Sequence, residues 1–567
     1  MGTVPIYAYE HERRTMEYTT PSGFRDVLAD EAAARERIAR SVADLFASRG
    51  YVPIETPTLE SMAVMQAGGR VPASPFKFFD ATGDLVTMRP DVTLQVARMC
   101  ATRLGDARGP FRFRYMQRVF RETEGQLRAD VREKKQIGIE CIDAAGVEAD
   151  AEVIGLFAEA LETAGVTDFK LSLATVGVLR ALLAASTAPE AWKQELLEAF
   201  HESNFVVIDE LCDRAQAKGS QFAPVIRELA RIRGGREAVQ KVRELVEPFG
   251  CAAALDPFEE TLDLIAANGL ADRIVVDFSV MSSFDYYTGI VFEAFAPGLG
   301  RAIGSGGRYD KLLATYGADR PAAGFAFYLE EAMEAAAAQK QAAERPLRIA
   351  VPKGSLNPDS IEALASAGLD VTGLDNPGRS LIISNPGVDY IIVRPSDAPI
   401  FVETGAADCG ICGEDSLLET ETDVVELVDL RFGACRFIVA EPEGAAERTA
   451  EHYRQLGSIR VATKYPRIAR AHFARRGTQV EIVELHGNIE LGPLTGMSEC
   501  IVDITATGTT LRENNLVITD EVLSSTARFF ANVASFRTDP RVRDLATKLK
   551  QQSADRTLKV TAGGEGK

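Results

Sequence analysis

The chain has 567 residues, enough for about three to four domains, and its hydrophobic fraction of 46% can fill real cores. The formal net charge of −19 argues against a general nucleic-acid binder and against a protein that binds anionic membranes. No run approaches the ~18 apolar residues of a membrane span, and Met1–Thr20 lacks a signal-peptide core. We therefore expect a cytoplasmic protein with no membrane and no nucleic acid among its partners.

The eight cysteines are scattered through the chain, which is typical of reduced thiols. Cys409 and Cys412 form a single CxxC pair, and the five histidines do not cluster near it, so a zinc site lacks ligands. We expect both thiols to pack as small apolar groups near a strand end; a redox pair is the alternative.

The first half begins with an extension over 1–20 that we expect to be loosely ordered. A helix is predicted over 30–49, because Ile38, Val42, Leu45 and Phe46 share one face. Alternating patterns then predict strands at 77–80, 85–88, 111–122 and 136–140, and helical periodicity covers 148–165 and most of 186–250. Antiparallel strands with helices set apart indicate an α+β layer.

Four motifs lie in this half: Phe120-Arg-Glu122, Gln136-x-Gly-x-Glu140, Phe284-Asp-Tyr-Tyr287 and Gly306-Gly-Arg-Tyr-Asp310. With them, residues 21–331 resemble the α+β catalytic core of a class II histidyl-tRNA synthetase. Two positions depart from that family: Ser282 and Glu331 stand where it usually has arginines. No anticodon-binding domain follows. An amino-acid pocket that has lost its activation chemistry resembles the regulatory subunit of ATP phosphoribosyltransferase, a synthetase paralogue.

The resemblance implies a histidine-binding pocket. Gln136 and Glu140 point to one face of their strand because their separation is even. Arg121 is expected to meet the α-carboxylate. The whole predicted set is Asp91, Thr93, Arg121, Gln136, Glu140, Tyr286 and Tyr287. The alternative is that these polar groups merely satisfy one another inside an inherited fold.

Residues 332–346 are Ala-rich and favour a helix, and Pro346 breaks the pattern. We interpret them as a helix end and linker with a domain boundary near 345; an ordinary surface helix is the alternative. The segment 347–355 then predicts a strand that runs into a turn at Lys353. Strand patterns at 378–383, 389–394, 407–413, 436–440 and 459–463 alternate with helices such as 359–367, which indicates a parallel-type α/β lobe. We expect the tail, 551–567, to be disordered.

A strand over 500–504 leads into a loop of small residues, which suits a phosphate. Backbone N–H groups and threonine hydroxyls of such a loop can surround an anion, and Gly508 can take positive φ. Asp503, at the strand end, can accept hydrogen bonds from sugar hydroxyls. The loop consists of Thr505, Ala506, Thr507, Gly508, Thr509 and Thr510. An ordinary Gly-Thr turn is the alternative.

Residues 347–550 resemble the short-form catalytic subunit of ATP phosphoribosyltransferase. The matching segments are Pro352-Lys-Gly354, Val393–Asp397, Phe432–Arg436, Ala462–Pro466 and Asp503–Leu511. The resemblance implies two α/β lobes like those of a periplasmic binding protein, with the active site in their cleft and the second lobe at about 441–515. Ser355 departs from the family, which often has arginine there.

In that family N1 of ATP attacks C1 of phosphoribosyl pyrophosphate, and pyrophosphate leaves with the help of Mg²⁺. The loop would hold the 5-phosphate, and Asp503 the ribose. Lys353 and Arg379 are candidates for the departing pyrophosphate; Lys353, Gly354, Arg394 and Lys464 are candidates for ATP. We expect Mg²⁺ to be carried by substrate phosphates rather than by protein ligands. For each lone cation the alternative is a solvated surface charge.

Together the resemblances imply a regulatory and a catalytic subunit fused in one chain, which catalyses the first step of histidine biosynthesis and is inhibited by histidine. We expect a homo-oligomer assembled through both halves. One alternative is a histidyl-tRNA synthetase-like enzyme with an appended small-molecule-binding domain, which Ser282 and Glu331 oppose. Another is a non-enzymatic sensor, which the phosphate loop opposes.

Overall fold

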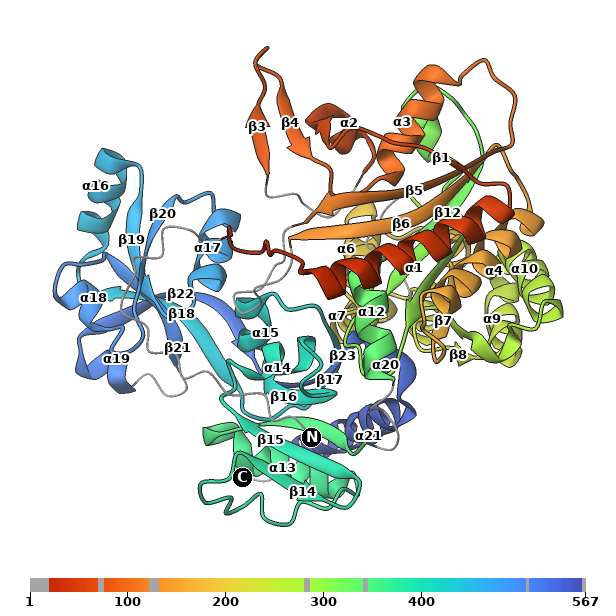
Figure 1. Cartoon of the computed structure of the whole chain (residues 1–567). Helices are drawn as coiled ribbons and strands as arrows, with labels where there is room; N and C mark the ends of the chain where they lie inside the picture. Colours follow the sequence, from red (N-terminus) through yellow and green to blue (C-terminus); the bar gives the residue numbers. More distant parts are fainter. Residues whose placement is uncertain are drawn as a thin grey trace, which may run out of the picture.

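The protein divides into two halves that lie against each other (Figure 1). The computed structural model describes residues 20–69, 76–121, 132–279, 286–339, 345–505 and 509–562. We call 20–339 the N-terminal half and 345–562 the C-terminal half. Among these residues no helix has both the length and the apolar character needed to cross a membrane.

The N-terminal half is built on a largely antiparallel sheet, as the α+β prediction requires. Within the described residues its nine strands are, in spatial order, β1 (Val52–Pro53), β5 (Phe111–Phe120), β6 (Glu133–Ile142), β12 (Ala322–Tyr328), β11 (Gly304–Arg308), β10 (Ile290–Phe295), β7 (Lys170–Thr175), β9 (Ile274–Asp277) and β8 (Arg233–Gly234). A small sheet joins β2 (Leu59–Ser61), β4 (Leu85–Met88) and β3 (Lys77–Phe79). The β3–β4 hairpin is the one that the alternation predicts.

Helices of this half surround the sheet. The predicted first helix is α1 (Ala29–Ser48), whose Val42 and Phe46 are fully buried. The others are α2 (Met62–Ala67), α3 (Thr93–Arg103), α4 (Val147–Thr163), α5 (Val176–Ala185), α6 (Glu190–His201), α7 (Phe205–Ala217), α8 (Phe222–Leu229), α9 (Arg236–Val246), α10 (Asp256–Ala267), α11 (Leu312–Thr315) and α12 (Leu329–Ala338). The helix α12 confirms the helical start of the Ala-rich segment, and its Ala332 and Ala335 are buried.

The C-terminal half has two sheets, and each is mixed rather than parallel. Described strands of the first are β14 (Ile382–Asn385), β15 (Val388–Val393), β13 (Leu347–Pro352), β16 (Cys409–Gly413), β23 (Ala527–Asn532) and β17 (Val424–Asp429). The central strands β15, β13 and β16 are parallel, whereas β14 and β23 pair antiparallel with their neighbours. The prediction of a parallel lobe is therefore wrong for β14, which a short turn joins to β15, and for β23, which follows the long strand of the second sheet.

The second sheet runs from Cys435 to Ser525, wider than the predicted 441–515, because the long strand β22 returns beside β18. Its strands in spatial order are β20 (Val480–Glu484), β19 (Ile459–Thr463), β21 (Cys500–Thr505), β18 (Cys435–Pro442) and β22 (Leu516–Ser525). Helices of this half are α13 (Asn357–Ser366), α14 (Ala398–Glu403), α15 (Glu414–Thr420), α16 (Ala446–Leu456), α17 (Pro466–Arg475), α18 (Leu491–Leu494), α19 (Thr509–Glu513), α20 (Val533–Thr538) and α21 (Pro540–Ala562).

The chain end differs from the prediction. The helix α21 continues to Ala562, so 551–562 are helical rather than disordered. Lysine, glutamine, alanine and leucine in this stretch favour a helix, and the first glycines come only at 563–564. The predicted extension over 1–19 and the residues 563–567 lie outside the described residues.

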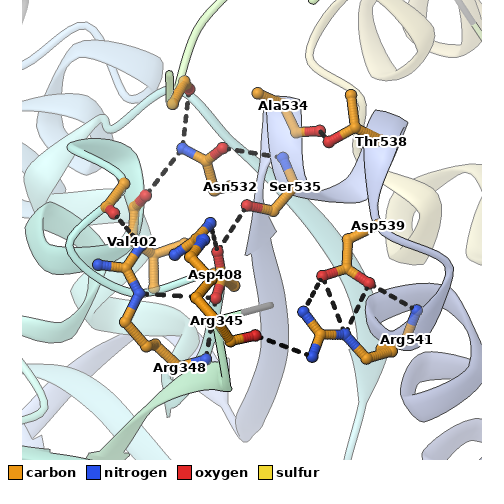
Figure 2. Close-up of polar contacts among 12 residues, drawn as sticks. Arg345, Arg348, Val402, Asp408, Asn532, Ala534, Ser535, Thr538, Asp539 and Arg541 are labelled. Atoms are coloured by element: carbon orange, nitrogen blue, oxygen red, sulfur yellow. Dashed lines mark hydrogen bonds and ion pairs between the residues drawn. The ribbon is translucent and has the colours of Figure 1, made fainter. Parts of the chain in front are cut away.

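The two halves share one hydrophobic core. A single buried cluster contains side chains of both, and the rings of Phe205 on α7 and Phe536 on α20 lie 5.7 Å apart. In the polar network drawn in Figure 2, Asn532 is the residue that reaches the N-terminal half. Asn532 Nδ2 donates to Gly300 O of the N-terminal half at 2.8 Å. The halves therefore form a continuous packed unit at this junction.

Candidate functional site

A cavity of about 290 Å³ lies over one face of the N-terminal sheet. The strands β6, β12, β11 and β10 supply its floor, and all seven residues predicted for a histidine pocket line it. The sheet permits this hollow because β11 has the sequence Gly-Ser-Gly-Gly-Arg. A Cβ atom on Gly307 would lie 2.7 Å from the Tyr287 ring, so this glycine makes room for the tyrosine.

Glu140 is the deepest acid in the cavity, with 1% of its surface exposed. Its Oε1 accepts hydrogen bonds from Thr93 Oγ1 at 2.7 Å and from Tyr115 OH at 3.2 Å, and its Oε2 accepts one from Tyr309 OH. Burial raises the pKa of Glu140 to about 8, against the effect of these donors. The carboxyl group is therefore largely protonated at neutral pH, and it can ionise if a cationic ligand arrives.

Gln136 and Asp91 form the next layer. Gln136 Nε2 donates to Asp91 Oδ1 at 2.8 Å, and its Oε1 accepts from the Val92 backbone at 3.1 Å. Arg121 enters from the end of β5, where its Nε donates to Pro90 O and its guanidinium lies 4.0 Å from Asp91. An acid, an amide and a guanidinium thus meet at one side of the cavity, as groups that bind an amino acid would.

Aromatic rings close the deep end. The Tyr286 and Tyr287 ring centroids are 4.8 Å apart, and Tyr309 lies 5.6 Å from Tyr286. Tyr309 belongs to the quoted motif 306–310, yet no ligand role was predicted for it. Ser282, Phe284 and Asp285 lie outside the described residues.

Glu331, on α12, is a buried acid held between two cations. It is 1% exposed, and Lys134 Nζ and Arg301 Nε lie 2.7 Å and 3.3 Å from its Oε1. Although burial opposes ionisation, these two cations hold the pKa of Glu331 below its ordinary value. Glu331 therefore remains an anion, and its charge offsets those of Lys134 and Arg301.

The far end of the cavity belongs to the other half of the chain. Asp423, Val533 and Arg537 line it together with His201, Ser203 and Glu293 of the N-terminal half. The sequence analysis missed all of them, and no local pattern marks them, because their positions depend on how the halves pack. The cavity is thus a site between the two halves.

The predicted cations of the first lobe lie along one edge of its sheet. Lys353 directly follows β13 and Arg394 directly follows β15, and these two strands are parallel neighbours in the sheet. Lys353 N donates to Val393 O at 2.8 Å. Arg379 precedes β14, which runs antiparallel to β15, so Arg379 returns to the same edge. All three side chains are exposed, and Gly354 has φ of +82° at the turn. The fold therefore brings together three positive charges that are separated in sequence.

The predicted sugar and nucleotide residues of the second lobe also share an edge. Asp503 lies near the end of β21, and Lys464 follows the parallel neighbour β19. Burial raises the pKa of Asp503, while Lys464 opposes the rise; Lys464 also interacts with Asp415 of the first lobe. Lys464 therefore lies between acids of the two lobes.

The phosphate loop is only partly described. Thr505 is the last residue of β21 and is 8% exposed, and Thr509 and Thr510 begin α19. Ala506, Thr507 and Gly508 lie outside the described residues. Three of the six residues predicted for the loop thus belong to regular elements, Thr505 to β21 and Thr509 and Thr510 to α19.

Other predicted groups are placed as follows. Cys409 and Cys412 are fully buried free thiols on β16, which confirms their assignment as packing residues. In the described ranges, no group of three or more histidine, cysteine, aspartate or glutamate side chains is arranged to hold a metal ion.

Two family models match the chain. Residues 23–332 match the histidyl-tRNA synthetase model, and residues 394–551 match the ATP phosphoribosyltransferase model.

Curated relatives fall into the same two groups. An ATP phosphoribosyltransferase of Rubrobacter xylanophilus is 53% identical over 193 residues, which are 34% of this chain and 89% of the relative. An ATP phosphoribosyltransferase regulatory subunit of Moorella thermoacetica is 37% identical over 314 residues, 55% of this chain and 80% of the relative. A solved Bacillus halodurans protein, described as an ATP phosphoribosyltransferase regulatory subunit/histidyl-tRNA synthetase, aligns with a TM-score of 0.52 at 26% identity, covering 67% of this chain and all of that one.

Proposed function

The chain belongs to the ATP phosphoribosyltransferase family and carries a histidyl-tRNA synthetase-like regulatory region before its catalytic domain, and from this premise we propose how the two parts work. It is an enzyme of histidine biosynthesis. We assign ATP and phosphoribosyl pyrophosphate as the substrates, with N1 of ATP displacing pyrophosphate from C1 of the ribose. The single observation that carries the assignment is 53% identity to a catalytic relative over nearly its full length.

Within the C-terminal half, Asp503 binds the ribose hydroxyls, and Thr505 to Thr510 bind the 5-phosphate. Lys353 and Arg379 neutralise the departing pyrophosphate, and Gly354, Arg394 and Lys464 contact ATP. Three cations at one sheet edge support this arrangement, because the reaction must hold two polyanions together. The two lobes close on the substrates as in periplasmic binding proteins. Mg²⁺ enters with the substrate phosphates and offsets the leaving-group charge.

The cavity of the N-terminal half senses histidine. Glu140 and Tyr286 meet the imidazole, Asp91, Thr93 and Gln136 meet the amino group, Arg121 meets the carboxylate, and Tyr287 lines the wall. A cavity with amino-acid-binding groups but a buried anion at Glu331 is suited to binding without activation. Because the C-terminal half forms one wall, bound histidine can lower turnover there. We propose that the protein acts in the cytoplasm as a homo-oligomer assembled through both halves.

The test uses the intact purified chain. Formation of phosphoribosyl-ATP from ATP, phosphoribosyl pyrophosphate and Mg²⁺ is measured with and without histidine, and histidine binding is measured by calorimetry. We expect turnover, binding and inhibition in the parent, and loss of binding and inhibition in the Gln136→Ala, Glu140→Ala double variant. The exposed pair Gln240 and Glu244, changed to alanine in the same way, is the matched control.

Two outcomes would reject parts of the proposal. Absence of phosphoribosyl-ATP would remove the catalytic assignment. Unchanged histidine inhibition in the cavity double variant would move the sensor elsewhere.

A further inference from the structure

Arg537 belongs to the C-terminal half but lines the cavity of the N-terminal half. It lies on α20 and is 4% exposed. One terminal nitrogen, Nη1, donates to Asp277 Oδ2 and to Ser279 Oγ. Its Nε has no hydrogen-bond partner in the described part of the chain. A buried guanidinium with an unused donor is costly unless a ligand completes its hydrogen bonds.

The charges around Arg537 leave capacity for an anion. Asp277, 2% exposed, is shared with Arg233, whose Nη1 lies 3.1 Å from the same carboxylate oxygen. Two guanidiniums thus face one aspartate. Burial opposes the ionisation of Asp277, but the two guanidiniums lower its pKa and keep it ionised. The other acids near Arg537 are Asp423 and Glu293, and burial raises the pKa of Glu293 to about 7. Because Asp277 is shared by two guanidiniums and Nε of Arg537 is unpartnered in the described part of the chain, Arg537 retains a donor for a carboxylate ligand.

Arg537 reaches the cavity from the C-terminal half, whereas Asp277 and Ser279, which its guanidinium contacts, belong to the N-terminal half.

We propose that Arg537 binds the α-carboxylate of the amino acid in this cavity, so that both halves of the chain hold one ligand. This inference rests on the proposed histidine-sensing function. Arg121, which also lines the cavity, remains the other cation assigned to this carboxylate. β23, which pairs with β16 and β17, leads directly through Asn532 into α20, so the ligand contacts the helix that continues a strand of the catalytic sheet. Ligand affinity and the position of α20 are thereby linked.

A purely structural role for Arg537, as the partner of Asp277, is the competing interpretation. The variants Arg537→Met and Arg233→Met separate the two roles, because each removes one guanidinium from Asp277 and only Arg537 lines the cavity. Two ligands are compared in order to isolate the contribution of the carboxylate. These are histidine and histidinol, in which a hydroxymethyl group replaces the carboxylate. Binding of both ligands to the intact chain is measured by calorimetry.

We expect Arg537→Met to weaken histidine binding about 10- to 100-fold, the range for a hydrogen bond to a charged group, while histidinol binding changes less than about threefold. Arg233→Met should leave both affinities within about threefold. Arg537→Lys, which keeps the charge, should restore part of the histidine affinity. If Arg537→Met does not fold, Arg537→Lys carries the test through the histidine-to-histidinol affinity ratio, which should fall several-fold.

The outcomes distinguish the inference from the function on which it rests. Equal histidine binding by the parent and the Arg537 variant, or equal losses for histidine and histidinol, would overturn the role of Arg537 and leave the sensor intact. A parent chain that binds no histidine would overturn both.

Discussion

Asn532 offers the sharpest test of how the halves are joined. Its side chain is fully buried, and Nδ2 donates to Gly300 O, Val402 O and Glu403 O at 2.8, 2.9 and 3.1 Å. Its Oδ1 accepts from Ser535 N at 3.0 Å and caps α20 (Figure 2). One amide group therefore connects the N-terminal half, α14 and the start of α20.

The change Asn532→Ala should cost about 3 kcal/mol of unfolding free energy. Val402 O keeps a second donor, Gly405 N at 3.0 Å. Gly300 O, Glu403 O and Ser535 N lose the bonds that Asn532 gives them, at about 1 kcal/mol each, which includes the lost helix cap. For a cooperative unit the size of the C-terminal half (345–562), this corresponds to a fall of about 6 °C in Tm.

The assay is thermal unfolding of the intact chain, with histidine inhibition measured on the same samples. Asn385→Ala is the matched control, because Asn385 Nδ2 also donates to two carbonyls, those of Asp370 and Thr372, but at the surface where water can replace it. We expect the control to shift Tm by less than about 2 °C, and Asn532→Ala also to weaken inhibition. A Tm for Asn532→Ala within about 2 °C of the parent would refute the free energy that we assign to these hydrogen bonds.

Three further predictions concern catalysis, lost chemistry and pH. Arg379→Ala should lower kcat on the order of 10²-fold, more than it raises KM, because charge on pyrophosphate grows in the transition state; a pure KM effect in steady-state kinetics would place Arg379 in ground-state binding. The intact chain should show no histidine-dependent exchange of pyrophosphate into ATP, because Glu331 is a buried anion held by Lys134 and Arg301; exchange at a synthetase-like rate would contradict this. Since Glu140 has a pKa of about 8 in the folded chain and an ordinary one when unfolded, its contribution to stability is present below about pH 4.5 and lost as pH rises to about 8. The slope is at most about 1.4 kcal/mol per pH unit, so Glu140→Gln should flatten the fall in Tm between pH 6 and pH 8, and an identical pH profile would disprove the assignment.

Local patterns in the sequence were sufficient for most elements. The helix α1 and the β3–β4 hairpin follow from periodicities of 3.6 and 2, which depend on neighbours along the chain. The same alternation put Gln136 and Glu140 on one face, and both line the cavity. Patterns failed where a strand pairs with a distant partner, as β22 does with β18, and at the chain end, where helix-forming side chains outweighed the expectation of disorder.

The sequence by itself determined the two halves, the polar residues of β6 that line the cavity and the positive residues after β13 and β15. Only the tertiary structure decided that Arg537 meets Asp277, 260 positions away, and that the cavity has a wall from each half. A buried ion pair leaves no periodic trace in either segment, because its partners are chosen by the packing of the shared core and not by their neighbours in the chain. The contact between the cavity and the C-terminal half therefore depends on the long-range contacts of α20.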